Sequence, residues 1–322
     1  MKVSVFVHAA QLPHFEATNY FHSPALMELC ERTPRLKPYM AVVQRDEGIV
    51  VAHMLAIMYF RRTWIPPFIY THVRVMGDGE YHADDTDRQH VFGLMASAVT
   101  SRFQNRTLYV EFSHLSEKMF GYRELRHLHF FPVRWMSIHN SLHSRTPEER
   151  ITKRMRRRVD SAMRRGATTK TVETDDEYRA FSRLLRHHNW LKPRRYLPVD
   201  DFFRGMMASG QCRIFITKVH EKVVGCSVCI YSNGDAYLWY SASRRKSFAS
   251  FHPNAVTFWN TIKDAHATGC AHIRFVDVGL PFRKNPYRDF ILRFGGKEVS
   301  TYRWFRISIR WVNALASWLW RE

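Results

Sequence analysis

The chain has 322 residues, which is enough for two α/β domains that each bury a core of their own. Hydrophobic residues make up 45% of it, a share that excludes a disordered chain. The formal net charge is +20, from 49 Lys and Arg against 29 Asp and Glu. This balance predicts attraction to polyanions such as nucleic acid, nucleotide phosphates or anionic lipid headgroups, and it fits an ordinary basic soluble protein equally well.

The five cysteines are an odd number, which argues against a disulfide framework and for a reducing compartment. Cys226 and Cys229 form a C-x-x-C, but they lie in the strand-like run VVGCSVCIY, where side chains three apart point to opposite faces. No second cysteine pair or suitably spaced histidine accompanies them. We therefore predict that both are packing residues, and we assign no metal site.

The first ten residues, MKVSVFVHAA, contain too short an apolar run for a signal peptide. No apolar stretch of the sequence reaches the length of a membrane span. The sequence thus predicts a cytoplasmic protein, with peripheral contact to the inner membrane surface as an option.

The order of expected helices and strands in residues 1–145 predicts an N-terminal domain. A helix is expected over residues 24–32, followed by the paired strands PYMAVVQ and GIVVAHMLAIMYF around a polar turn at residues 45–48. A third strand spans roughly residues 68–75, and a helix runs from about Asp85 to Phe103 with apolar residues at helical spacing. The strands LYVEF and HFFPVRWMSI complete this half.

Residues 146–309 predict a C-terminal domain that repeats the same order after a basic helix. Thr146-Pro147-Glu148-Glu149 is a capping box with Pro at the first helical position, and the helix is expected to run to Arg165. Its predicted buried stripe consists of Ile151, Met155, Val159, Ala162 and Met163. The strands CRIFITKV, VVGCSVCIY and DAYLWYSAS follow, then a helix from about Pro253 to Thr268, and the strands HIRFVDVG and EVSTYRWFRISI.

The two halves also share residues. Glu111 in LYVEF matches Asp277 in RFVDV, and Arg134-Trp135 matches Arg303-Trp304, at offsets of similar length. Matching blocks in the same order indicate an internal repeat. The predicted fold class is therefore α/β, with two tandem domains that each contain a mixed, mostly antiparallel sheet flanked by helices.

Residues 310–322 predict a C-terminal amphipathic helix. One face carries polar residues and the other carries large apolar ones: Arg310, Asn313, Ser317 and Arg321 against Trp311, Leu315, Trp318 and Leu319. Tryptophans beside arginines suit the surface of an anionic membrane. The alternative is a helix that packs its apolar face on the second domain.

Several motifs of the second half resemble one known family. They are Tyr237-Leu238-Trp239-Tyr240-Ser241, the run Phe275 to Gly279, and Phe290-x-x-x-Phe294-Gly295-Gly296. In this order the motifs resemble the C-terminal half of FemAB-type aminoacyltransferases, which have tandem domains of the acetyltransferase-like (GNAT) fold. The first half resembles that family through the internal repeat. The sequence departs from the family pattern at Leu280, where a second glycine is frequent, and at Arg293, where a lysine is frequent.

The resemblance implies an activity. The family joins an amino acid from aminoacyl-tRNA to an amine of a cell-wall precursor, and related members of the fold transfer acyl groups from thioesters. It also implies that no cofactor is bound permanently, since the acyl donor is a co-substrate.

Asp277 is the predicted catalytic residue, because it ends an otherwise apolar strand, where α/β sheets place reactive groups. A carboxylate there would orient or deprotonate the attacking ammonium. The alternative is a structural Asp that caps the following loop.

Two basic segments are predicted to bind substrate phosphates. Arg244, Arg245 and Lys246 precede a helix in the segment RRKSFASFHPNA, which contains no glycine and so restricts close approach of the backbone to a coenzyme A pyrophosphate. Arg283, Lys284, Arg288 and Arg293 surround Tyr287, a combination that suits a phosphate- or nucleotide-bearing substrate. Solvated surface loops are the alternative for both segments.

The arginine-rich helix over residues 147–165 would bind tRNA or simply present a solvated face. The leading prediction is an acyltransferase that moves an acyl or aminoacyl group to an amine of a cell-envelope or polysaccharide-type precursor. The alternatives are an acyl-CoA-dependent N-acetyltransferase acting on a small amine, and a non-catalytic polyanion-binding protein of the same fold.

Overall fold

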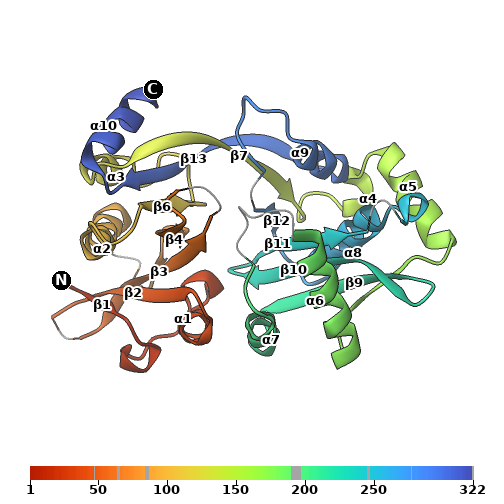
Figure 1. Cartoon of the computed structure of the whole chain (residues 1–322), viewed down its shortest axis with the longest axis horizontal. Helices are drawn as coiled ribbons and strands as arrows, with labels where there is room; N and C mark the ends of the chain where they lie inside the picture. The colour runs from red at the N-terminus through yellow and green to blue at the C-terminus, as the bar shows by residue number, and fades with distance from the viewer. Residues whose placement is uncertain are drawn as a thin grey trace. The chain divides into compact units, whose positions relative to one another are not determined.

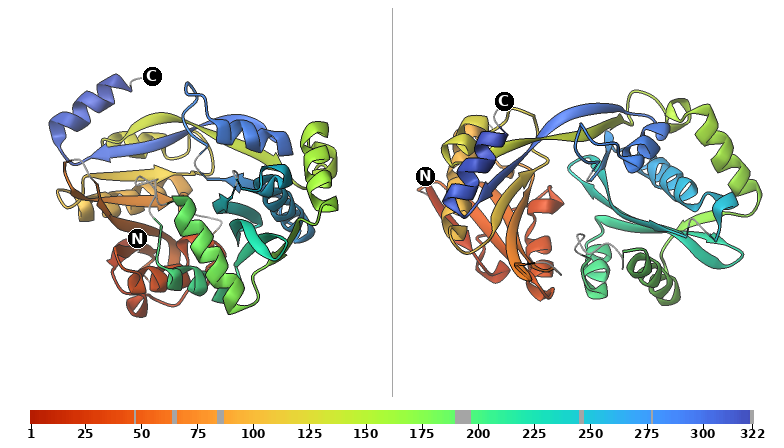
Figure 2. Two further views of the ribbon diagram at one scale, coloured as in Figure 1. Left: turned by 45° about the vertical axis from the view of Figure 1, so that its right-hand side comes forward. Right: turned by 45° about the horizontal axis from the view of Figure 1, so that its top comes forward.

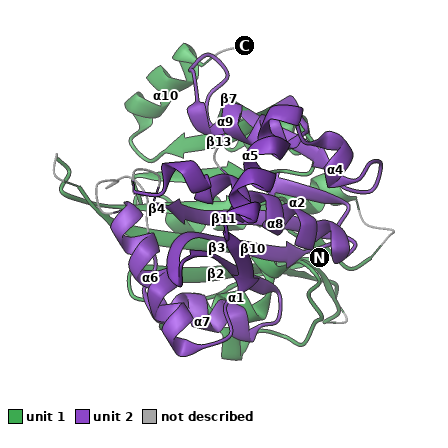
Figure 3. Cartoon of the chain, turned by 90° about the vertical axis from the view of Figure 1, so that its right-hand side faces the viewer, with its two compact units in different colours: residues 1–135, 300–322 green, residues 136–299 purple. Residues whose placement is uncertain are grey.

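The computed structural model describes residues 1–46, 48–63, 66–83, 87–189, 197–244, 247–276 and 278–320. The chain forms two compact units, shown in different colours in Figure 3. Unit 1 consists of Met1–Trp135 and Ser300–Glu322, and unit 2 of Met136–Val299. Two strands cross the unit boundaries: β7 (Phe131–Ser141) begins in unit 1, and β13 (Lys297–Ile307) begins in unit 2.

Unit 1 contains a mixed sheet with helices on both faces (Figure 1). Its elements besides β7 and β13 are β1 (Lys2–Phe6), η1 (Ala9–Gln11), η2 (Tyr20–His22), α1 (Pro24–Arg32), β2 (Leu36–Gln44), β3 (Val50–Arg62), β4 (Ile69–Met76), β5 (Glu80–Tyr81), α2 (Arg88–Phe103), β6 (Tyr109–Ser113), α3 (Tyr122–His127) and α10 (Arg310–Leu319). The strand order is β1-β2-β3-β4-β6-β13, with β5 also paired to β3, and β4 and β6 form a parallel pair.

The core of unit 1 lies between α2 and one face of this sheet. Phe92, Met95 and Val99 of α2 are fully buried against Val73 and Phe112 of the parallel pair. The opposite face of β2 is also apolar and buried, and there α1 packs. Burial on both faces explains why β2 and β3 are nearly continuous apolar runs and do not alternate with polar residues.

Unit 2 repeats this plan. Its elements are α4 (Pro147–Arg150), α5 (Lys153–Arg164), β8 (Thr168–Thr171), α6 (Asp175–Asn189), α7 (Asp200–Ala208), β9 (Cys212–Val219), β10 (Lys222–Ser232), β11 (Asp235–Ser243), η3 (Ala249–Phe251), α8 (Pro253–Ala267), β12 (His272–Phe275), α9 (Pro286–Ile291) and η4 (Leu292–Phe294). The strand order is β7-β12-β11-β10-β9-β8, and β11 and β12 form the parallel pair. Helices α6 and α8 lie on opposite faces of the sheet (Figure 2).

The repeat therefore appears in three dimensions as predicted, as two mixed and mostly antiparallel sheets flanked by helices. The compact units differ from the sequential halves 1–145 and 146–309, because the last strand of each half pairs in the other unit. The end of β7 pairs with β12, through Ile273 and Asn140, and the end of β13 pairs with β6, through Trp304 and Phe112. Strand pairing thus ties residues 300–322 to unit 1.

The predicted helix over residues 147–165 is two helices. Thr146 forms the predicted capping box, but α4 ends at Arg150, where buried Ile151 adopts an extended backbone. The amide of Thr152 then donates a hydrogen bond to the carbonyl of Arg293 at 2.9 Å, and α5 begins at the next residue. Of the predicted buried residues, Met155, Val159 and Ala162 are buried in α5 and Ile151 is buried before it, whereas Met163 is 43% exposed. Helices α6 and α7 were not predicted.

The predicted packing role of the cysteines is confirmed. Cys226 and Cys229 are both buried in β10, and all five cysteines are buried and free. Burial raises the pKa of each thiol, so none is a thiolate near neutral pH.

Candidate functional site

The first turn of α8 is anchored to the sheet of unit 2 by a row of threonines. The hydroxyl of Thr257 donates to the carbonyl of Pro253 at 2.7 Å and lies 2.6 Å from the hydroxyl of Thr217 on β9. Thr217 in turn lies 2.8 Å from the hydroxyl of Thr169 on β8. A Cβ at Gly225 would lie 2.3 Å from the Thr257 hydroxyl, so only glycine lets β10 pass this close. These contacts fix the direction in which the N-terminus of α8 points.

The amides at the N-terminus of α8 donate no hydrogen bond to the side chain of its N-cap residue. The N-cap residue, His252, has a left-handed backbone (φ 42°, ψ 51°), and its side chain makes no capping hydrogen bond. Its carbonyl accepts hydrogen bonds from the amides of Ala255 and Val256. The positive end of the α8 dipole therefore has no negative charge from its own cap residue.

Helix α5 adds cations beside the N-terminus of α8. Lys153, Arg154, Arg157, Arg158 and Ser161 line one open cavity of about 650 Å³ together with His252. Arg158 and His252 also line an adjacent cavity of about 340 Å³, which reaches Pro253 and Asn254 in the first turn of α8. Desolvation and the nearby charges of Arg158 and Arg165 lower the pKa of His252, so the ring is neutral near pH 7.

In the described part of the chain, no carboxylate forms an ion pair with Arg154, Arg157 or Arg158. Helix α5 keeps its acidic partner, Asp160, beside Arg156 at 4.0 Å. Uncompensated guanidinium groups next to a helix N-terminus are suited to bind the phosphates of a substrate. We name Arg154, Arg157, Arg158, His252 and the first turn of α8 the α5–α8 site.

The parallel strands of unit 2 separate next to this helix. Asp235–Leu238 of β11 pair with His272–Phe275, but β11 continues to Ser243, while β12 ends at Phe275. In unit 1 the corresponding pair stays together to the end of β4, and the amide of Gly77 still donates to the carbonyl of Ser113 at 2.8 Å. Separation of two parallel strands opens the sheet at their carboxyl ends, where α/β proteins bind ligands.

Three of the residues predicted for the site, Asp277, Arg245 and Lys246, lie outside the described residues. Arg244 is exposed at the end of β11, and its amide donates to the carbonyl of Val224 at 2.8 Å. The side chains of Arg283, Lys284 and Arg293 are also exposed. Their roles remain predictions.

Arg288 and Tyr287 have structural contacts. Arg288 is 8% exposed, and its guanidinium donates to the carbonyls of Leu280 and Arg283 at 3.0 and 3.3 Å. Its Nε atom also lies 2.9 Å from Glu298 Oε1. The ring of Tyr287 packs edge-on against Phe258 of α8, with the ring centroids 6.1 Å apart. Arg288 therefore stabilises the loop that carries Arg283 and Lys284.

The sequence did not single out Arg158 or His252 as site residues. The arginines of α5 were recognised as a basic helix, and their spacing carried a further signal: Arg154, Arg157, Arg158 and Ser161 are three or four residues apart and so share a face. That this face lies beside α8 depends on packing between segments about 100 residues apart.

A family model, described as an acetyltransferase (GNAT) domain, matches residues 150–284. The crystal structure of FemX is similar over 98% of this chain and all of that one, with a TM-score of 0.65 and 13% identity. The C-terminal domain of a putative lysylphosphatidylglycerol synthetase from Agrobacterium fabrum is similar over 92% of this chain and 91% of its own, with a TM-score of 0.59 and 10% identity. A tandem GNAT protein from the clavulanic acid biosynthesis pathway gives 0.54 and 11%, over 95% and 99% of the two chains. No curated protein sequence matches the chain.

The fold and the matched domain define the class of protein: a GNAT-fold acyltransferase with two copies of the fold in tandem. The likeness to FemX extends over both units and shows that the two chains share this fold. Among the described residues, no helix combines the length and the hydropathy that crossing a bilayer requires.

Proposed function

We propose that this protein transfers an aminoacyl group from a charged tRNA to an amine of a cell-envelope or polysaccharide-type precursor. The observation that carries the proposal is a row of arginines on α5 that form no ion pair with a described carboxylate and lie beside the N-terminus of α8, whose N-cap side chain makes no capping hydrogen bond. Helix α5 has 12 residues and is therefore about 18 Å long, which is enough to follow several phosphates of an RNA backbone.

In this proposal the α5–α8 site holds the acceptor end of the tRNA. The neutral amine attacks the carbonyl carbon of the aminoacyl ester, a C–N bond forms, and the C–O bond to the ribose breaks. The amine loses a proton, and the leaving ribose oxygen takes one up. Asp277 is proposed to orient the ammonium group or accept its proton, as its position at the end of an apolar strand predicts.

Two further features support an aminoacyl donor. The segment before α8 lacks the glycines that let a backbone approach a coenzyme A pyrophosphate closely. One structure with the same fold is that of a putative lysylphosphatidylglycerol synthetase, whose name states that an amino acid is attached to a lipid.

The second candidate is an acyl-CoA-dependent N-acyltransferase. The matched model is described as an acetyltransferase domain, and a helix N-terminus with two neighbouring arginines also suits a pyrophosphate. The two candidates differ in the donor that binds at the same site.

Binding measurements separate the two donors. Filter binding of charged tRNA over a series of salt concentrations is expected to show tight binding, with a slope that falls by about 2–3 in the variant Arg154→Gln/Arg157→Gln/Arg158→Gln, because each lost phosphate contact removes about 0.7–0.9 from the slope. Calorimetry with acetyl-CoA is expected to show no binding.

The matched control removes three exposed cations elsewhere, in the variant Arg62→Gln/Arg183→Gln/Lys222→Gln. Equal tRNA affinity and equal slope in both variants would contradict the α5–α8 site. Arginine-dependent binding of acetyl-CoA, with no tRNA binding, would establish the second candidate. Donor binding without turnover of any amine would favour the non-catalytic polyanion-binding alternative.

A further inference from the structure

Helix α10 carries its apolar side chains on the outside of the molecule. No residue of α10 is buried. Trp311 is 71% exposed, Trp318 59% and Leu319 64%, and Leu315 and Ile309 are about half exposed. Within unit 1, therefore, no described residue covers the apolar face of α10.

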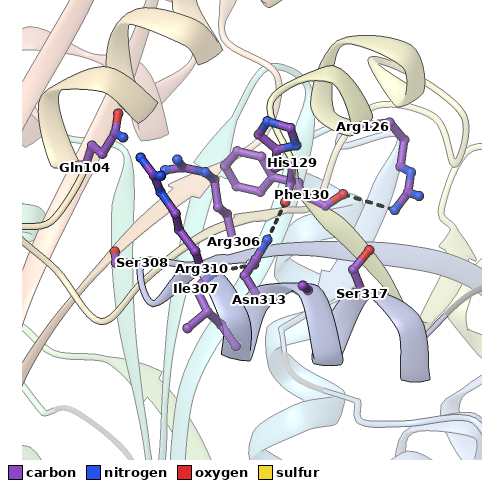
Figure 4. Close-up of a pocket in the computed structure, with 11 residues that line it drawn as sticks. Gln104, Arg126, His129, Phe130, Arg306, Ile307, Ser308, Arg310, Asn313 and Ser317 are labelled. Atoms are coloured by element: carbon purple, nitrogen blue, oxygen red, sulfur yellow. Dashed lines mark hydrogen bonds between the residues drawn. The ribbon is translucent and has the colours of Figure 1, made fainter.

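The polar face of α10 is the one that contacts unit 1. Asn313 accepts a hydrogen bond from the amide of Ile307 at 2.7 Å, and it donates to the carbonyl of His129 at 3.0 Å. Figure 4 shows Asn313 and Ser317 pointing from α10 into the cavity between the helix and the rest of the unit. These hydrogen bonds orient the helix so that its tryptophans face the solvent.

Cations line the cavity on the polar side of α10. The cavity has a volume of about 490 Å³ and is lined by Arg126, Arg306 and Arg310 together with His129. Arg306 and Arg310 extend in the same direction, as Figure 4 shows. Partial burial and the charge of Arg310 lower the pKa of Arg306. No acidic side chain lines the cavity in the part of the chain that the structure describes, so this positive charge is available to an anion from outside.

We infer that α10 docks the protein on the surface of an anionic phospholipid bilayer, with Trp311, Leu315, Trp318 and Leu319 in the interfacial layer and Arg306 and Arg310 at the lipid phosphates. A helix that lies in a membrane interface has large aromatic and aliphatic side chains on one face and arginines beside them, as α10 has. The arginines select an anionic surface, because each basic residue at such a surface contributes about a fivefold gain in binding. A bilayer fits this combination better than a protein partner does, since the apolar face belongs to a single helix and lies near Arg306 and Arg310, which form no ion pair with a described carboxylate. The inference is independent of the proposed donor, because α10 and the α5–α8 site lie in different units.

The test is co-sedimentation of the full chain with vesicles of phosphatidylcholine alone, and of phosphatidylcholine with phosphatidylglycerol in equal parts. We expect the protein to sediment with the second kind and to stay largely in the supernatant with the first. The variant Trp311→Ser/Trp318→Ser is expected to bind the mixed vesicles about a hundredfold more weakly, because it loses the apolar area that would be buried. The variant Arg306→Gln/Arg310→Gln is expected to bind about 25-fold more weakly and with a smaller salt dependence, because it loses two basic residues that contribute about fivefold each.

Two controls keep the result interpretable. Arg183→Gln/Lys222→Gln removes the same charge from exposed positions of unit 2 and is expected to bind like the original protein. The melting temperatures of all variants are expected to agree within a few degrees, because the substituted tryptophans are mostly exposed. If the tryptophan variant fails to fold, the arginine variant and the lipid dependence of the unaltered protein still decide the question.

Three outcomes would overturn the inference. The unaltered protein would fail to sediment with mixed vesicles, or the tryptophan variant would sediment as well as the original protein. The third outcome is a tryptophan-dependent dimer in the absence of vesicles, which would identify a second copy of the chain as the occupant of this face. None of these outcomes changes the expectation for tRNA binding, which is measured without lipid.

Discussion

Each unit packs a corresponding helix against its sheet, α2 in unit 1 and α8 in unit 2, but the N-termini of these two helices differ. In unit 1, Asp87 caps α2, and its Oδ1 atom accepts hydrogen bonds from the amides of Gln89 and His90 at 3.1 and 3.2 Å. In unit 2, α8 has no such cap and has Arg158 beside its first turn. One helix end is neutralised by a carboxylate of the chain itself, and the other has arginines beside it and is proposed to bind an anion of the substrate.

The carboxylate that the repeat places in unit 1 has structural contacts. Glu111, which matches Asp277 in the repeat, is 6% exposed, and its Oε1 atom lies 3.4 Å from both Arg74 and Arg303. The guanidinium of Arg303 also stacks over the ring of Trp135 at 4.0 Å. Unit 1 therefore uses this carboxylate, in the middle of β6, to pair with arginines of the neighbouring strands β4 and β13. The comparison teaches that the repeat conserves positions whose roles have separated, structural in unit 1 and proposed to be catalytic in unit 2.

The comparison is tested most directly by removing the charge at each of the matching positions, Asp277 and Glu111. We expect Asp277→Asn to lower the transfer rate by about 10²–10⁴-fold with little change in melting temperature, since it would remove a general base. Turnover assays with charged tRNA and an amine acceptor measure this. An Asn variant that turns over normally would rule out the catalytic role.

Glu111→Gln is expected to act on stability. It removes the negative charge beside buried Arg303 and partly buried Arg74, which costs about 3–5 kcal/mol of unfolding free energy. Urea unfolding measures the loss, and turnover per folded molecule should stay near that of the original protein. A stable Glu111→Gln variant with reduced turnover would show that unit 1 takes part in the reaction.

Acid should destabilise unit 1 through its buried histidines. Burial and the neighbouring His53 lower the pKa of His22 to about 3, and burial lowers that of His53 to about 4 despite the opposing effect of Glu80. Both values lie below the unfolded value of 6.5, so the unfolded chain binds more protons in this range. The stabilisation is complete above pH 6.5 and is lost as the pH falls towards 4, at a rate of up to about 1.4 kcal/mol per pH unit for each histidine.

Thermal unfolding of the full chain at pH 7 and at pH 5 measures this effect. The variant His53→Gln is expected to lose less stability on acidification than the original protein, while the exposed control His90→Gln should match the original. Equal pH dependence in all three proteins would contradict the assignment.

The smallest expected change in stability comes from substituting Asp87, the N-cap residue of α2. Asp87→Ala should cost about 1 kcal/mol of unfolding free energy, because two amides of α2 lose their acceptor. Asp87→Asn, which keeps an acceptor, should cost only a fraction of that. Chemical denaturation resolves both changes, and neither should alter donor binding. Weaker tRNA binding in Asp87→Ala would place a ligand in unit 1 after all.

The sequence by itself determined the local elements and their repetition. The apolar spacing of Arg88–Phe103 and Pro253–Ala267, the polar turns between paired strands and the capping box at Thr146 all depend on residues a few positions apart. The same holds for the amphipathic pattern of residues 310–319 and for the basic character of α5. Such features can be read from sequence because helix and strand periodicity involve near neighbours.

Only the tertiary structure decided which distant segments meet. It paired the end of β13 with β6, interrupted the basic helix at Ile151, placed Arg158 beside the first turn of α8, and turned the tryptophans of α10 outward. Each of these outcomes depends on a partner far away in the chain, since an edge strand or an amphipathic face is compatible with several partners until packing and hydrogen bonding select one. The periodicity of a segment specifies that it has an apolar face, but what covers that face is set by the rest of the fold.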